Sequence, residues 1–206
     1  MIYKKLLADE FYKLHPMLQK RYELPLDANF YAEGTMQEIK SGNRLLKPFY
    51  YLMTKNDFLF PESGQFIPFS IRNESRMNER NEGEVFWERT FHFPNVSRKF
   101  NATMTVDFER RIVKDYLGKP ARFYSDLLFN VTKDGQLLIR SNEQRFVFPP
   151  FEINLPKYMH GKVTVLEGYD DVRQCYTIDV FIYNNLFGRM MHYAGTFKQL
   201  PHESNV

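Results

Sequence analysis

The sequence predicts an α+β fold: a strongly curved, mostly antiparallel sheet of about eight or nine strands, shaped as a cup or incomplete barrel, with N-terminal helices packed on it. Aromatic residues make up 17% of the 206 residues, and such side chains favour the half-buried surface of a sheet. Most of the chain after residue 65 alternates between apolar and polar side chains, as strands with one buried face do. Short turns join these segments, which favours antiparallel neighbours.

The N-terminal third predicts short helices and one alternating segment. Apolar residues recur at helical spacing from Leu6 to Leu18, and Pro16 interrupts them and can begin a second helix, so two helical pieces are expected to meet near His15. Residues 30 to 36 alternate instead. A further helix is expected over residues 43 to 54, with one apolar side formed by Leu45, Leu46, Phe49, Tyr50 and Met53.

Nine strands are expected in the rest of the chain, each bounded by turn residues. They are Phe66–Asn73, Gly83–Phe93, Phe100–Phe108, Ile112–Tyr116, Arg122–Thr132, Gln136–Phe148, Lys162–Tyr169, Cys175–Tyr183 and Arg189–Lys198. The segment Pro149–Pro156 contains three prolines, which cannot donate to a ladder, so it is expected to cross an edge or end of the sheet. Strands continue on both sides of it without a flexible linker, and residues 1–206 are expected to form a single domain.

Composition excludes several classes of function. The net charge is +3 and the basic residues are dispersed, which argues against a nucleic-acid partner. No run approaches the roughly 20 apolar residues of a membrane span, so no membrane insertion is expected. The single cysteine, Cys175, cannot form an intramolecular disulfide and favours a reducing compartment, so we expect a cytoplasmic protein.

No motif for a cofactor, a metal or a catalytic group stands out. The histidines lie at no metal-binding spacing, and no Gly-rich loop could hold a nucleotide. We therefore expect no metal and no cofactor, and the sequence identifies no catalytic residue. The five histidines are His15, His92, His160, His192 and His202.

Arg89 is the most informative residue, because it lies on the apolar face of a predicted strand. Alternation over residues 85 to 93 places Arg89 on the same side as Trp87 and Phe91. A buried, unpaired charge costs several kcal/mol, roughly, so Arg89 needs a carboxylate partner, a water-filled pocket or an acidic ligand. Glu167 is the candidate partner, since it lies on the apolar face of its own strand with Val163 and Val165.

Several short motifs lie along the chain in a fixed order. They are 14–18 (LHPML), 87–91 (WERTF), 163–171, 176–180 (YTIDV), 184–189 (NNLFGR) and 193–197 (YAGTF). Their order resembles the bacterial domain-of-unknown-function family 4166, in its short stand-alone form. The resemblance covers nearly the whole chain, and Asn185 departs from it where a proline is expected. This family implies no established activity and no catalytic residues.

Three hypotheses of function remain open. A curved sheet has a concave side that is filled either by its own side chains or by a ligand. The preferred hypothesis is a binding module for an apolar or amphipathic small molecule with an acidic head. There are two alternatives. One is an enzyme with spatially converged polar residues, and the other is a structural or protein-interaction domain with an unidentified protein partner. The candidate ligand-binding residues are Arg89, Trp87, Phe91, Glu167 and Tyr193.

Overall fold

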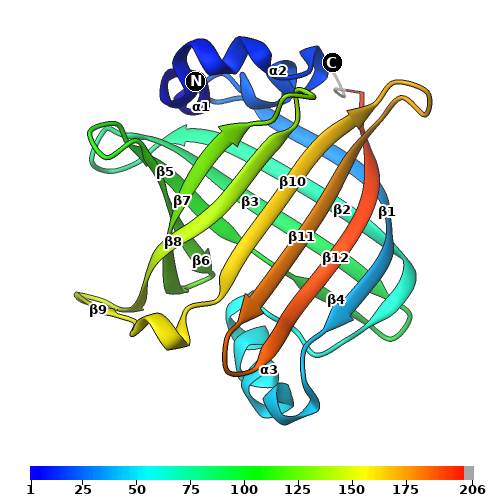
Figure 1. Ribbon diagram of the computed structural model, residues 1–206, viewed down its shortest axis with the longest axis vertical. Helices are drawn as coiled ribbons and strands as arrows, with labels where there is room; N and C mark the ends of the chain where they lie inside the picture. The colour runs from blue at the N-terminus through cyan, green and yellow to red at the C-terminus, as the bar shows by residue number, and fades with distance from the viewer. Residues whose placement is uncertain (202–206) are drawn as a thin grey trace.

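Twelve antiparallel strands form one sheet in residues 1–201, which are the residues that the computed structural model describes. Ten of them close into a barrel, in the order β1, β2, β3, β5, β6, β7, β8, β10, β11, β12 (Figure 1). The strands are β1 (Asn29–Ser41), β2 (Gly64–Met77), β3 (Gly83–Phe93), β4 (Val96–Lys99), β5 (Ala102–Asp107), β6 (Ile112–Gly118), β7 (Ala121–Val131), β8 (Leu137–Phe148), β9 (Phe151–Asn154), β10 (Lys162–Asp170), β11 (Cys175–Asn184) and β12 (Gly188–Gln199).

The barrel closes through a short ladder between β8 and β10. Four residue pairs join these strands, from Thr164 opposite Arg140 to Glu167 opposite Leu137. Beyond that ladder, β8 pairs instead with β9, which lies outside the ring. The closed ring corrects the predicted cup or incomplete barrel of about eight or nine strands, because a ladder between strands separated by a proline-rich connection leaves no local sequence pattern.

Helical segments lie at both ends of the barrel (Figure 1). The first group is α1 (Ile2–Leu7), the 3-10 turn η1 (Ala8–Lys13) and α2 (Pro16–Tyr22), and it buries Tyr3, Leu6, Phe11 and Leu18 against one end. The opposite end carries η2 (Arg44–Leu46), α3 (Lys47–Met53) and η3 (Thr54–Asn56), with η4 (Lys157–Met159) between β9 and β10.

The expected meeting of two helical pieces at His15 is confirmed. His15 is the N-cap of α2, and its Nδ1 accepts a hydrogen bond from the backbone N–H of Met17 at 3.2 Å. Pro16 is the first residue of α2, where its missing N–H costs no helical hydrogen bond. The helix expected over residues 43 to 54 is also present as α3 with its flanking turns, but Leu45 is 84% exposed and does not belong to its buried side.

All nine strands expected after residue 65 are present, together with three further strands, β1, β4 and β9. β1 follows the alternating segment near residue 30, whereas β4 and β9 are only four residues long and lie beside turns and prolines. The three-proline segment contains β9 at the edge of the sheet, as the prolines require. The sheet is thus larger than predicted, with its main strands at the predicted positions.

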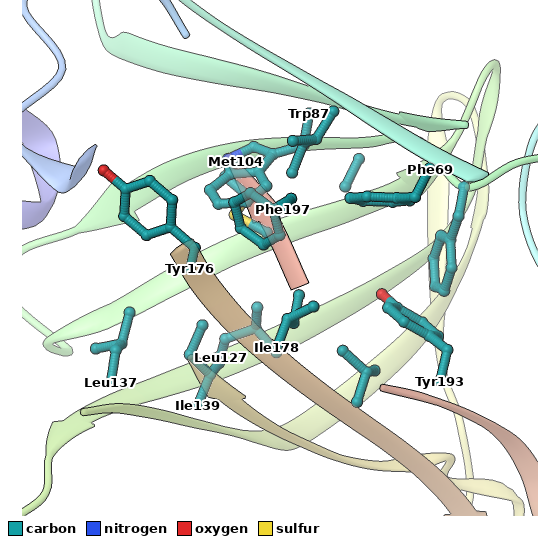
Figure 2. Packing of buried hydrophobic residues seen from close by; sticks show 14 of the residues in the cluster. Phe69, Trp87, Met104, Leu127, Leu137, Ile139, Tyr176, Ile178, Tyr193 and Phe197 are labelled. Atoms are coloured by element: carbon teal, nitrogen blue, oxygen red, sulfur yellow. The ribbon is translucent and has the colours of Figure 1, made fainter. Parts of the chain in front are cut away.

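Side chains from all around the wall point into the barrel and form one hydrophobic cluster. Figure 2 shows Ile178 of β11 and Leu127 and Ile139 of β7 and β8 directed toward the interior together with Trp87 and Met104. β1 and β12 approach closely at Gly34, where a Cβ atom would overlap the carbonyl oxygen of Thr196.

Candidate functional site

A cavity of about 330 Å³ lies inside the barrel. Its lining is mostly apolar and comes from the strands together with the segment around α3. Among the side chains that line it are Phe49, Phe100, Met104, Phe123, Leu127, Phe129, Ile139, Phe146, Val165, Ile178 and Val180. The concave side of this sheet is therefore not completely filled by its own side chains.

Arg89 lines this cavity from β3 and is only 9% exposed. Its Nε donates to the carbonyl oxygen of Phe100 at 3.1 Å, and its Nη1 donates to the hydroxyl of Tyr193 at 3.2 Å. The guanidinium also lies over the Phe100 ring, 4.5 Å from the ring centre. These contacts leave Nη2 available to a further acceptor.

Asp115 is a further charged residue of the lining, and it is not among the residues predicted from the sequence. It lies on β6 with 5% exposure, and its Oδ1 is buried without a hydrogen-bond partner among residues 1–201. Burial raises the pKa of Asp115 to about 7, although the positive charge of Arg89 opposes the rise. The two side chains form no ion pair within the described residues, so each keeps hydrogen-bonding capacity toward the cavity.

The expected ion pair between Arg89 and Glu167 is wrong, because the partner of Glu167 is Arg21. The Arg21 Nε on α2 lies 3.1 Å from Glu167 Oε2, and both side chains are almost completely buried. Burial by itself would lower the pKa of Arg21, but Glu167 together with Tyr22 and Tyr176 raises the pKa overall. Five aromatic rings surround the guanidinium, those of Tyr22, Phe30, Trp87, Tyr176 and Phe197.

The five candidate ligand-binding residues divide into two groups. Arg89, Trp87 and Glu167 line the cavity. Phe91 and Tyr193 are fully buried behind that lining, with ring centres 5.2 Å apart. Tyr193 is joined to the lining by its hydrogen bond with Arg89, and Phe91 packs against Tyr193.

Trp87 has the polar partner that a buried indole requires. Its Nε1 donates to the hydroxyl of Tyr3 at 3.0 Å, and that hydroxyl donates to the Sδ atom of Met104 at 3.3 Å. The strand β3 and the helix α1 are thus joined by a buried hydrogen bond at the end of the barrel that the N-terminal helices cover.

The mouth of the cavity lies at the α3 end. Met159 and Phe187 are the two lining residues with exposed side chains, and they belong to η4 and to the turn before β12. Leu46 and Phe49 line the same region from η2 and α3 and are half-buried. A molecule entering the barrel would pass these four side chains before it reached Arg89.

Comparison with known proteins supports the resemblance seen in the sequence. A family model described as "Domain of unknown function (DUF4166)" matches residues 14–197. The chain belongs to this family. It is similar to a Bacillus subtilis (strain 168) protein described as "Uncharacterized protein YndH", with 36% identity over 203 residues that cover 98% of each chain. No solved structure matches the chain.

The DUF4166 motif at residues 184–189 forms the wall of the mouth. The Asn184 side chain donates to the carbonyl oxygens of Tyr158 and His160, at 3.0 Å each. The backbone N–H groups two and three residues further on donate to its Oδ1. Asn185, where the family pattern predicts a proline, is exposed, and the turn is held by Asn184 beside it.

Two of the histidines, His15 and His192, lie beside carboxylates. His15 Nε2 lies 3.3 Å from Asp171 Oδ2, and His192 Nε2 lies 3.1 Å from Asp179 Oδ1. Residues 1–201 contain no group of three or more His, Cys, Asp or Glu side chains that could hold a metal ion. His202 lies outside the described residues. The helices of residues 1–201 are all too short or too polar to cross a lipid bilayer.

Proposed function

We propose that this chain binds a small amphipathic molecule inside the barrel, with an acidic head at Arg89 and an apolar body along the aromatic lining. The observation that carries the proposal is that Arg89 and Asp115 both line a mostly apolar cavity without forming an ion pair with each other in the described residues. The hydrogen bonds of Arg89 use its Nε and Nη1 and leave Nη2 for a ligand. Asp115 Oδ1 has no hydrogen-bond partner within the described residues. A buried polar atom such as Asp115 Oδ1 is normally satisfied, and a ligand head that reached it would also lie within reach of the Arg89 guanidinium.

Physical chemistry favours an acid over other heads. A carboxylate or phosphate oxygen accepts charge-assisted hydrogen bonds from a guanidinium, and the protonated form of Asp115 can donate a further one. The apolar body would gain about 25 cal/mol for each Å² removed from water. The cavity volume of about 330 Å³ lies at the small end of known ligand sites, so one short chain or ring system fits best.

Native mass spectrometry of freshly purified protein tests for a bound mass. Titration with fatty acids and isoprenoid acids of graded length then measures affinity through the fluorescence of Trp87, the single tryptophan, which lines the cavity. We expect the affinity to rise with each methylene group until the cavity is full. Arg89→Met should weaken binding of acids more than binding of the matching alcohols, and Arg72→Met, on an exposed side chain, should change neither.

Two results would discard the proposal. One is an affinity that does not depend on chain length. The other is an equal loss for acids and alcohols in Arg89→Met, which would mean that the arginine supports the wall rather than the head of the ligand. Circular dichroism of each variant separates loss of binding from loss of fold.

An enzyme is the second candidate, and Asp115 is the observation that favours it. A carboxyl group with a pKa raised to about 7 beside an arginine in a cavity is suited to accept or donate a proton near neutral pH. In that case Asp115→Asn should bind the same molecule but fail to convert it. Mass analysis of a bound compound after incubation with the protein and with Asp115→Asn compares the two candidates.

A further inference from the structure

The exposed apolar side chains of this protein are concentrated around the cavity mouth. We define the mouth surface as residues 43–56, 148–162 and 184–190, which include η2, α3, η3, β9, η4 and the turn before β12. These 36 residues hold 10 of the 22 large apolar side chains that are exposed in residues 1–201. The most exposed are Leu45, Leu52, Phe151, Ile153, Tyr158 and Leu186. Exposed apolar side chains gathered in this way mark an interaction site.

Positive charge is concentrated on the same surface. The mouth surface has six basic residues and one acidic residue, whereas the rest of the chain has 22 basic and 24 acidic residues. Glu152, the acidic one, is held by Arg145 at 2.9 Å. The basic side chains are all exposed, and none forms an ion pair within residues 1–201. They are Arg44, Lys47, Lys55, Lys157, Lys162 and Arg189.

The mouth surface is continuous with the cavity lining. Met159 and Phe187, the two exposed lining residues, belong to it, and Leu46 and Phe49 extend from it into the barrel. An apolar molecule that entered the barrel at the mouth surface would therefore contact apolar side chains from the mouth to the interior.

We propose that the mouth surface docks onto the headgroup region of an anionic lipid bilayer. Exposed Phe, Leu and Ile side chains would enter the boundary between headgroups and acyl chains, and Tyr51 and Tyr158 would lie at the headgroups. The unpaired basic side chains would face the anionic lipids. Four of the six basic residues are lysines, which protein–protein interfaces disfavour, and this favours a bilayer over a protein partner.

This docking goes beyond ligand binding and does not depend on it. The bilayer would supply or receive apolar molecules at the mouth if the barrel binds them, but the contact itself needs only the outer side chains. Failure of docking would leave the binding proposal intact, and failure of ligand binding would leave docking intact.

Vesicle flotation with the full chain tests the proposal. Vesicles of phosphatidylcholine alone are compared with vesicles that also contain phosphatidylglycerol, at low and high salt. We expect the protein to float with the anionic vesicles, more weakly at high salt. The double variant Leu45→Ser/Phe151→Ser and the double variant Lys47→Glu/Lys157→Glu should each reduce binding about tenfold or more, since each removes one of the two attractions.

Matched controls come from the opposite end of the barrel. Val172, in the turn before β11, is 94% exposed, and Lys133 is exposed in the turn before β8. Val172→Ser and Lys133→Glu should leave flotation unchanged. The substituted side chains are all exposed, so each variant is expected to fold, and circular dichroism checks this.

Three outcomes would overturn the proposal. The first is no flotation with anionic vesicles. The second is an equal loss of flotation in the controls, which would indicate a general effect of charge or hydrophobicity. The third is a stable dimer or a stable complex with another protein that Leu45→Ser/Phe151→Ser dissolves, in the absence of vesicle binding.

Discussion

The Arg21 Nε on α2 lies 3.1 Å from Glu167 Oε2 on β10, and this ion pair is buried at the end of the barrel covered by the N-terminal helices. Nη1 and Nη2 of Arg21 have no hydrogen-bond partner within the described residues, so the guanidinium depends on Glu167 and on the aromatic rings around it. The pair joins a helix to the strand that closes the ring.

Removal of one partner of this pair should be far more damaging than removal of both. Arg21→Met leaves the Glu167 carboxylate buried without a countercharge and should lower the free energy of unfolding by about 3 to 5 kcal/mol. The double variant Arg21→Met/Glu167→Leu should recover much of that loss. Urea denaturation of the single and double variants measures both.

Arg89 provides the control for this double-mutant cycle. Because Arg89 and Glu167 form no ion pair in the described residues, the coupling between Arg89→Met and Glu167→Leu should be much smaller than the coupling between Arg21→Met and Glu167→Leu. A strong coupling between Arg89 and Glu167, or none between Arg21 and Glu167, would contradict the pairing.

Asp115 should make the protein less stable as the pH rises. Burial raises its pKa from an ordinary value of 3.8 to about 7, so between these values the folded protein holds a proton that the unfolded chain has lost. The free energy of unfolding should therefore fall with rising pH, by at most about 1.4 kcal/mol per pH unit, and level off above pH 7. Asp115→Asn should remove this contribution, as denaturation at several pH values would measure. Asp134→Asn, in an exposed turn, should leave the pH dependence unchanged.

The buried indole of Trp87 should depend on Tyr3. Tyr3→Phe removes the acceptor of the indole N–H and leaves a buried donor unsatisfied, which should cost about 1 to 3 kcal/mol. Thermal unfolding followed by tryptophan fluorescence measures the loss. Tyr12→Phe, on a side chain that is 63% exposed, should change the stability by less than about 0.5 kcal/mol. Equal stability of the two variants would show that the hydrogen bond is not formed.

The close approach of β1 and β12 should make Gly34 intolerant of any side chain. In Gly34→Ala the new Cβ atom would overlap the backbone of β12, and the strands would have to separate at a cost of about 1 to 3 kcal/mol. In Gly161→Ala, by contrast, the Cβ atom would make ordinary contacts of 3.5 Å to Ile182 and 3.6 Å to Met190, and the change should cost less than about 1 kcal/mol. Denaturation curves of Gly34→Ala and Gly161→Ala test the register of β1 against β12.

Alternation along single strands predicted the positions of the main strands and the buried position of Arg89. It could not predict which strand lies opposite, and so the partner of Glu167 and the closure between β8 and β10 were both missed. Arg21 lies in a short helix whose apolar spacing does not indicate an arginine directed into the barrel. The burial of Asp115 could have been predicted, because Asp115 lies on the same face of β6 as Val113 and Leu117. Arg89 shares a face of β3 with its aromatic neighbours in the same way.

Closure of the ring also bears on how this protein behaves at high concentration. Among the strands of residues 1–201, β4 and β9 are the two that are paired along one side only, and each is four residues long. β4 carries Arg98 and Lys99, and two prolines precede β9. Short, charged or proline-flanked edges are poor templates for strand addition by another molecule. A chain with twelve strands and abundant aromatic residues is thereby protected from edge-to-edge aggregation in its folded state.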